Sequence, residues 1–188
     1  MDLKLIYGNM RALCEAPQMM LHYADIPYEY KMVWDHYGSS WAEVKKDIIF
    51  NRLPILIINE DKYLWQSNTI IRYLSNLTKT KPSDEFQLAY CDAVFESTHE
   101  MFSPLNPTIN MTFGEKYNSN KKKLLEDILP NSLNNFEKLL QNSSGNFFIG
   151  NDPFYCDFNA YHHFSMCLIL DKNIFSNFPN LKKFINNF

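Results

Sequence analysis

Tyr7 is the first residue whose type and position could do chemistry. The apolar run Leu3 to Tyr7 predicts a β-strand, and Gly8 and Asn9 predict a turn directly after it. The phenol would therefore lie at the carboxyl edge of a sheet, where it could donate a hydrogen bond to an anion. A hydrogen bond to a charged group contributes about 1.5–3 kcal/mol. The alternative is a core tyrosine that ends a buried strand.

A second group of polar residues follows a predicted β-hairpin. The apolar run Ile55 to Ile58 closes with the turn residues Asn59 to Asp61, and Tyr63 to Trp65 predicts the returning strand. Gln66 and Ser67 then open a helix, in which Ser67 is the predicted N-cap. The helix is indicated by apolar residues at helical spacing, Ile70, Ile71 and Leu74. Free N–H groups at such a helix start bind carboxylates well.

A tryptophan and a lysine form a third candidate group. Trp41 and Lys45 are four residues apart, so on a helical turn they share a face and offer an indole N–H and a cation. The alternative is a surface tryptophan beside an unpaired lysine.

The order of the predicted elements divides the chain into two domains. Residues 1–77 read as a small α/β layer, 78–83 as a polar linker that contains Pro82, and 84–188 as an all-helical domain. The first domain is predicted to hold a strand at Leu3 to Tyr7, a helix at Ala12 to Ala24, a strand at Tyr28 to Val33, an irregular segment, the hairpin and the helix after it. The second is predicted to hold helices at Asp84 to about Asn110, Lys121 to Gln141, Asp157 to Asp171, and from Leu181.

Composition limits the classes of partner. A net charge of -3 gives no reason to expect nucleic acid, and no apolar stretch has the length of a signal peptide or a membrane helix. We therefore expect a cytosolic protein without a membrane partner. The four cysteines lack C-x-x-C spacing and are predicted to be packed thiols, and no metal site is expected, because the adjacent His162 and His163 point in different directions on a helix.

These motifs together resemble the cytosolic glutathione transferase family. Leu53 to Leu74 matches the family's Leu-Pro pair, hairpin and Gln-Ser-Asn helix start, and Tyr7 to Leu13 is similar to the mu class. The spacing from Trp41 to Leu53 is more similar to the sigma class. Two segments near the other end resemble the family's C-terminal helical domain. They are Phe148 to Asn151 with Asp157 and Phe158, and Phe178 to Lys182. The resemblance implies a thioredoxin-like N-terminal domain followed by an all-α domain.

The resemblance also implies roles for individual residues. Tyr7 would be the catalytic residue that stabilises the thiolate of glutathione, the co-substrate. Leu53 would pair with the glutathione backbone across a cis bond to Pro54, although a plain turn proline is the alternative. Glu100 of a partner subunit would meet the amino group, and Glu96 lies four residues earlier on the same face. The full implied glutathione set is Leu13, Trp41, Lys45, Arg52, Leu53, Pro54, Gln66, Ser67 and Glu100.

By the same resemblance, the protein is a homodimeric detoxification enzyme that conjugates glutathione to a small apolar electrophile. Isomerase or peroxidase chemistry on the same site is not separated by sequence. The implied electrophile pocket comprises Met10, Arg11, Met101, Phe102 and Leu105, although methionine and aromatic residues on a helix more often belong to a core. The alternative is a catalytically weak binding or scaffold module, because one fold hosts many functions.

Several positions depart from the family pattern. Gly8 replaces an aromatic residue, Ala12 replaces a glycine, and Arg52 replaces an asparagine, which would make the site wider and more basic. Phe154 stands where a helix-capping hydroxyl is usual, so Asn151 or Asp152 is expected to cap that helix instead. The chain ends at Phe188, before the last helix and tail that the resemblance implies.

Overall fold

The computed structural model describes residues 1–188 and divides into two compact units, Met1–Lys81 and Pro82–Phe188. No helix in either unit is long and apolar enough to cross a membrane.

Unit 1 is built on a four-stranded mixed sheet with the strand order β2-β1-β3-β4. β1 pairs in parallel with β2 and antiparallel with β3, which pairs antiparallel with β4. The strands are β1 (Leu3–Tyr7), β2 (Glu29–Met32), β3 (Ile55–Ile58) and β4 (Lys62–Trp65). All of β3 is buried, as expected for an apolar, β-branched strand that is covered on both faces. The predicted thioredoxin-like α/β fold is confirmed.

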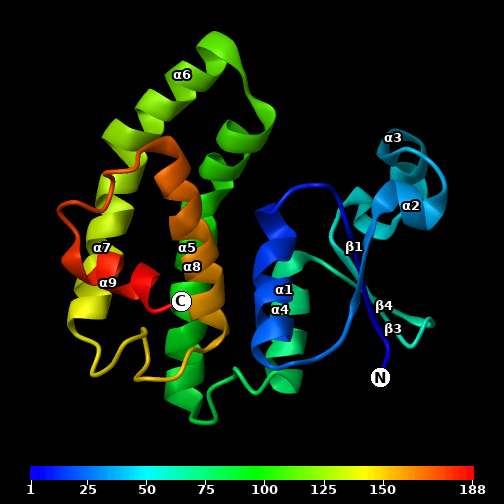
Figure 1. Ribbon diagram of the computed structural model, residues 1–188, viewed down its shortest axis with the longest axis horizontal. Coiled ribbons are helices and arrows are strands. Elements are labelled where there is room, and N and C mark those ends of the chain that lie inside the picture. Colours follow the sequence, from blue (N-terminus) through cyan, green and yellow to red (C-terminus); the bar gives the residue numbers. More distant parts are fainter. The chain divides into compact units, whose positions relative to one another are not determined.

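Two helices cover one face of this sheet. A 3-10 turn at Ala12–Cys14 leads into α1 (Glu15–Tyr23), and α4 (Ser67–Leu77) packs beside α1 on the same face (Figure 1). α4 turns its buried apolar residues toward the sheet; they are Ile70, Ile71 and Leu74. The helical spacing that predicted α4 is therefore its core-facing stripe.

The segment between β2 and β3 covers the other face. It was predicted to be irregular, but it contains the short helices α2 (Val33–Tyr37) and α3 (Trp41–Val44) followed by two 3-10 turns. A cluster on this face is formed by Ile6, Val33, Ile48, Ile55 and Ile57, with Trp41, Val44, Leu53 and Trp65 packed against it. The segment between β2 and β3 is therefore held by burial of its apolar side chains on this face, although those side chains do not recur at a regular spacing in the sequence.

Unit 2 is all-helical, as predicted. Its helices are α5 (Glu85–Met111), α6 (Gly114–Lys123), α7 (Leu129–Gln141), α8 (Tyr155–Leu170) and α9 (Pro179–Asn186). The long α5 lies against α8, and a π-helical turn at Leu124–Ile128 joins α6 to α7 (Figure 1). Glu137 of α7 accepts the N–H groups of Asn180 and Leu181 at 3.0 and 2.9 Å, so its carboxylate caps the start of α9.

The structure corrects the predicted start of one helix. Lys121 to Lys123 were expected to begin a helix, but they are the last residues of α6, which begins at Gly114. Gly114 has a φ of +59°, a value that favours glycine and marks the turn between α5 and α6. Lysines in a last turn also interact favourably with the helix dipole, so the lysine run suits a helix end.

The structure also corrects the predicted cap of α8. Neither Asn151 nor Asp152 caps this helix; instead, Asp157 inside its first turn accepts the N–H of Phe154 at 2.9 Å. Its other oxygen accepts the N–H of Phe148 at 3.0 Å, and the carboxyl is completely buried. One side chain therefore both caps α8 and holds the preceding loop.

Buried cysteines occupy both units. Cys14, Cys91, Cys156 and Cys167 are all free and buried, which confirms the prediction of packed thiols. Burial raises the pKa of the Cys167 thiol to about 12, so at neutral pH this side chain is an uncharged apolar residue.

Candidate active site

Strand register brings three separate chain segments to one edge of the sheet in unit 1. Ile6 lies opposite Ile55, and Ile55 lies opposite Trp65. β3 runs antiparallel to β1 and β4, so the residue after Ile6, the residue before Ile55 and the residue after Trp65 form a row at one edge of the sheet. This row contains Tyr7, Pro54 and Gln66. The candidate catalytic tyrosine thus shares an edge with the predicted backbone-binding and carboxylate-binding residues.

Tyr7 is held with its phenol oxygen facing the start of α1. The ring is buried, and the oxygen accepts a hydrogen bond from the Leu13 N–H at 3.3 Å. Burial raises the pKa of Tyr7, an effect that the Leu13 N–H partly offsets. The phenol therefore keeps its proton at neutral pH, and because its oxygen accepts from Leu13, the O–H remains able to donate. Leu13 acts through its backbone in this arrangement.

The start of α4 differs from the prediction. Ser67 was expected to be the N-cap, but it is the first helical residue, and Gln66 is the N-cap, with φ 70° and ψ 118°. The Gln66 carbonyl accepts the N–H of Ile70 at 3.0 Å. Ser67 is buried and its hydroxyl donates to Asn68, whereas Gln66 is exposed. The start of α4 still lies at this sheet edge, and the N-terminus of a helix is a favourable place for an anion.

The Leu53–Pro54 peptide bond is cis, as the resemblance implied. Pro54 is buried next to β3, and Leu53 packs against the apolar cluster on the face that α2 and α3 cover. Arg52, one residue earlier, is exposed and extended, with φ −141° and ψ 152°. The Arg52 cation and the Leu53 backbone, which is predicted to pair with glutathione, are therefore consecutive in the chain and directly precede Pro54.

Trp41 and Lys45 lie on and just after α3, as their spacing predicted. Trp41 is partly buried against the apolar cluster, and Lys45 is exposed. The start of α3 is held by Glu43, whose carboxylate accepts from the Ser40 hydroxyl at 2.7 Å, from the Ser39 hydroxyl at 2.9 Å and from the Ser40 N–H at 2.9 Å. These bonds lower the pKa of Glu43 and fix the turn that presents Trp41.

Two of the predicted pocket residues lie beside Tyr7 in the chain. Met10 and Arg11 are both exposed on the turn after β1, and Arg11 pairs with Glu15 at 2.9 Å. This pair spans one turn at the start of α1, so it orders the segment whose Leu13 N–H reaches Tyr7.

The other predicted residues lie on α5 in unit 2. Glu100 is exposed, whereas Met101, Phe102 and Leu105 are buried. The Phe102 ring stacks on His163 of α8 at 4.0 Å between ring centroids. Phe102 thus contributes to the helical core, and the roles assigned to these four residues stay predictions.

Sequence reasoning missed a contact that supports Tyr7. Tyr30 on β2 donates its hydroxyl to the Gly8 carbonyl at 2.7 Å, which fixes the backbone directly after the candidate catalytic residue. Tyr30 shows no signal in a single sequence, because alternation on a strand does not reveal a partner on the next strand.

Gly8 itself has room for a side chain. A Cβ placed there would meet only the Met10 Cε, at 3.9 Å, and its φ is not positive. We therefore expect Gly8→Ala to raise the free energy of unfolding by about 0.4–1 kcal/mol, because it restricts the unfolded chain without strain. Urea denaturation measures this. The matched control is Gly38→Ala. Gly38 has a φ of +66°, which strains a side chain, so this substitution should lower the free energy of unfolding. A loss at Gly8 would contradict the prediction.

Comparison with known proteins agrees with this geometry. The family models described as "Glutathione S-transferase, N-terminal domain" and "Glutathione S-transferase, C-terminal domain" match residues 1–76 and 99–188. A glutathione S-transferase of Plasmodium yoelii yoelii is 33% identical over 168 residues, which cover 80% of this chain and 77% of the relative. The chain belongs to the glutathione S-transferase family.

Other members of the glutathione S-transferase family match along almost the whole chain. Glutathione S-transferase P of Caenorhabditis elegans is 28% identical over 192 residues, covering 100% of this chain and 88% of the relative. The solved structure of the Onchocerca volvulus pi-class glutathione S-transferase superposes with a TM-score of 0.85 at 26% identity, covering 100% of this chain and 87% of that chain. Mu-class relatives match as well. The predicted family is therefore confirmed.

Proposed function

We propose that this protein conjugates the thiolate of glutathione to small apolar electrophiles. The observation that carries the proposal is the Tyr7 phenol, whose oxygen accepts the Leu13 N–H and whose proton stays available to donate. In the proposed reaction the glutathione thiol releases its proton to water, and Tyr7 donates a hydrogen bond to the resulting sulfur anion and stabilises it. The sulfur lone pair then attacks an electrophilic carbon, and the electron pair of the broken bond leaves with the departing group or moves along the substrate's π system.

The strength of this one hydrogen bond sets the size of the effect. Each unit by which the thiol pKa falls requires about 1.4 kcal/mol of preferential stabilisation of the thiolate. A hydrogen bond to a charged acceptor supplies about 1.5–3 kcal/mol. Tyr7 alone therefore accounts for one to two units, and the Leu13 N–H, by polarising the phenol, supports the same donation.

The remaining residues of unit 1 are proposed to bind the glutathione peptide. Its glycine carboxylate is assigned to Trp41 and Lys45, with Arg52 adding a second cation at the same side of the site. Leu53 is assigned to the backbone of the cysteine, in the manner of an added strand. The γ-glutamyl carboxylate is assigned to Gln66, Ser67 and the backbone N–H groups at the start of α4.

We also propose that the active form is a homodimer in which Glu100 of one subunit meets the glutathione amino group of the other. Support for the dimer comes from the family, and from the exposure of Glu100 on α5. Analytical ultracentrifugation would give the oligomeric state directly, with a monomer as the contradicting result.

The decisive test is a glutathione titration followed by thiolate absorbance at neutral pH. Wild type should give a saturating thiolate signal, and Tyr7→Phe should bind glutathione but lose the signal, with activity toward an aromatic electrophile falling about 10- to 100-fold. The matched control is Tyr28→Phe, which removes a hydroxyl bonded to Gln18 and His22 elsewhere in unit 1. It should keep the signal.

The opposite result would favour the second candidate function. Gly8 leaves open the side of Tyr7 where the family carries an aromatic residue, which suits a binding or scaffold module with weak catalysis. Binding of glutathione without a thiolate signal in wild type would support that module. An unchanged signal in Tyr7→Phe would remove Tyr7 from the mechanism.

A further inference from the structure

The turn between α5 and α6 exposes two large apolar side chains that are two residues apart in the chain. Met111, the last residue of α5, is 59% exposed, and Phe113, directly before α6, is 81% exposed. Gly114 follows with a φ of +59°, so the chain turns sharply there. Figure 1 shows α6 at one end of unit 2, away from the C-terminus. The two side chains therefore lie on an exposed corner of this unit.

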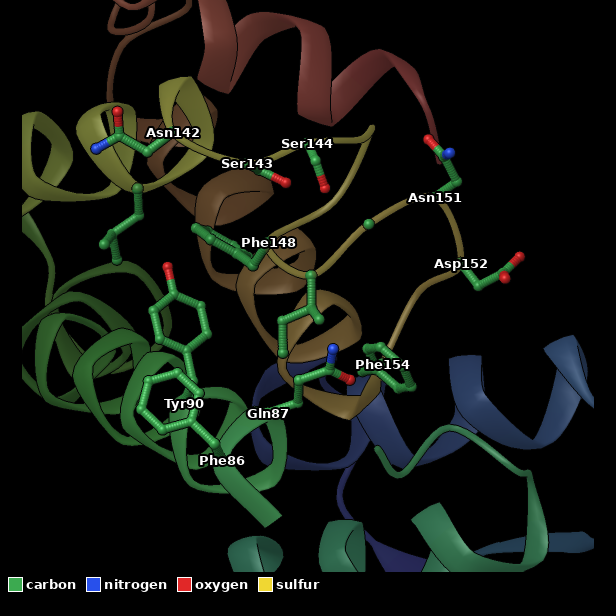
Figure 2. Close-up of a pocket in the computed structure, with 13 residues that line it drawn as sticks. Phe86, Gln87, Tyr90, Asn142, Ser143, Ser144, Phe148, Asn151, Asp152 and Phe154 are labelled. Atoms are coloured by element: carbon green, nitrogen blue, oxygen red, sulfur yellow. The ribbon is translucent and has the colours of Figure 1, made fainter. Parts of the chain in front are cut away.

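Neither capping nor packing explains the phenylalanine at this corner. Phe113 is the N-cap of α6, but it makes no side-chain capping hydrogen bond, and serine, threonine, aspartate or asparagine are preferred at such a position. Phe86 has a similar exposure, 78%, but it lines a cavity beside Tyr90 of the same helix (Figure 2), and Phe113 lies outside that cavity. A residue that breaks a local rule without a gain in packing is typical of a functional surface.

Positive charge is concentrated on the helix that follows the corner. The ten residues of α6 contain four lysines and one glutamate, a net charge of +3, whereas the whole chain carries −3, so the other residues together carry −6. Lys116 and Lys123 are exposed and lie seven residues apart, hence on one face of the helix. Lys122 is also exposed, and the Lys121 ammonium lies 6.0 Å from the centre of the Tyr117 ring.

Acidic residues near α6 reduce this charge without cancelling it. Glu115 is the one acid within α6, and it lies seven residues before Lys122, so these two share a face. In the π-helical turn after α6, Asp127 adds a negative charge, and Glu126 pairs with Lys122 at 4.0 Å, an exposed contact that is weak in water. The face that carries the first and last lysines of α6 has no acid within the helix, so a negatively charged surface would meet this face.

We propose that Met111, Phe113 and the lysines of α6 form a surface that docks the protein on membranes containing anionic phospholipid. The two apolar side chains enter the boundary between headgroups and acyl chains, and the lysines lie at the headgroup phosphates. Phe113 and Lys123 are ten residues apart, about 15 Å along the helix axis, so one helix face can lie on the membrane. No membrane partner was expected because no stretch of the sequence could span a bilayer, but a surface that lies on a bilayer needs no spanning helix.

The small apolar area favours a bilayer over a protein partner or a second copy. A stable protein interface buries about 800 Å² on each partner around an apolar core. At this corner the apolar part consists of Met111 and Phe113, and the exposed residues of α6 that follow are polar or charged. A bilayer accepts such a small apolar wedge, because its negative surface attracts the lysines over about 8–10 Å at ordinary ionic strength.

Co-sedimentation with vesicles tests the proposal on the full chain. Vesicles of phosphatidylcholine with about 30% phosphatidylserine should bind the protein at least about tenfold more tightly than vesicles of pure phosphatidylcholine. Raising the NaCl concentration from about 0.1 to about 0.5 M should weaken binding to the anionic vesicles about tenfold, because salt screens the lysines. Absence of binding to the anionic vesicles, or equal binding to both compositions, would overturn the proposal.

One pair of substitutions tests the apolar part of the surface. Phe113→Ser should weaken binding to the anionic vesicles about tenfold, because it removes the ring that enters the bilayer. Serine is a preferred N-cap, so α6 should stay intact, which circular dichroism checks. The matched control is Phe86→Ser, which removes an equally exposed phenylalanine on α5 and should bind the vesicles as wild type does.

A second pair tests the charge. The double substitution Lys116→Gln with Lys123→Gln should weaken binding about 10- to 30-fold, since each lysine near an anionic surface contributes about fivefold. Its control is Lys182→Gln with Lys183→Gln, two exposed lysines of α9, which should bind as wild type does.

Two further outcomes would contradict a membrane surface at this corner. Unchanged vesicle binding in both Phe113→Ser and the double variant of α6 would place the contact elsewhere on the protein. If Phe113→Ser instead lowers the sedimentation coefficient of the free protein and leaves vesicle binding unchanged, the corner joins two copies of the chain, and the proposal is overturned.

Discussion

Replacing Asp157 by alanine is expected to lower the free energy of unfolding by roughly 2–5 kcal/mol. The Asp157 carboxyl is buried and accepts the N–H groups of Phe148 and Phe154, at 3.0 and 2.9 Å. Its removal leaves both N–H groups in the protein interior without an acceptor, and it takes the cap from α8. The loop and the helix lose their common anchor in a single substitution.

Chemical denaturation followed by helical circular dichroism measures this loss. The matched control is Asp152→Ala, an exposed aspartate on the same loop that makes no hydrogen bond to the helix start. Its unfolding free energy should stay within about 0.5 kcal/mol of wild type. Equal losses in the two variants would show that negative charge near the helix start matters, and that the two hydrogen bonds do not.

Asp157 also makes stability depend on pH in an unusual direction. Burial raises its pKa from 3.8 to about 7, although the N–H groups of Phe148 and Phe154 act in the opposite sense. At a pH between these two values, the Asp157 carboxyl is protonated in the folded protein and ionised in the unfolded chain. The contribution of this group is therefore complete at low pH and is lost as the pH rises toward 7, by up to about 1.4 kcal/mol per unit. The difference between wild type and Asp157→Asn isolates it.

The second large effect is a loss of stability in acid that His163 causes. This side chain is buried, stacks on Phe102, and its Nδ1 lies 3.0 Å from the Thr98 carbonyl. Burial holds its pKa well below the ordinary 6.5, and the neighbouring His162 and His99 act in the same direction. The unfolded chain takes up the proton first, so stability falls as the pH drops below about 6.5, by up to about 1.4 kcal/mol per unit.

Unfolding free energies measured from pH 7.5 down to pH 4.5 test this prediction. His163→Asn keeps a donor for the Thr98 carbonyl but does not titrate, so it should be less stable than wild type at neutral pH and converge on it in acid. A constant difference between the two proteins at every pH would contradict the prediction. Because Asp157 acts in the opposite sense over the same range, each variant must be compared with wild type separately.

Sequence was sufficient for most of the architecture. The strand that ends at Tyr7, the hairpin and the stripe of α4 follow from periodicity and turn residues, because each element turns apolar residues toward one core. The cis bond before Pro54 followed from the resemblance, since a single sequence carries no signal for the isomer.

The remaining details depend on contacts between distant segments. The Gln66 backbone takes an uncommon conformation that no propensity favours, so Ser67 was wrongly predicted to be the cap. The double role of Asp157 depends on Phe148, nine residues away. The start of α6 depends on the positive φ of Gly114, and one glycine is a weak turn signal. Phe102 meets His163 across two helices, which helical spacing alone cannot reveal.

The row formed by Tyr7, Pro54 and Gln66 links activity to the order of folding. Ile6 pairs with Ile55, forty-nine positions along the chain, so the row cannot exist before that long-range pairing has closed. Closing such a loop is slow relative to forming α1 or α4. During refolding, helical signal should therefore return first, and the proposed ionisation of glutathione should return only when the sheet is complete. A glutathione titration during refolding would then report the last stage of assembly of unit 1.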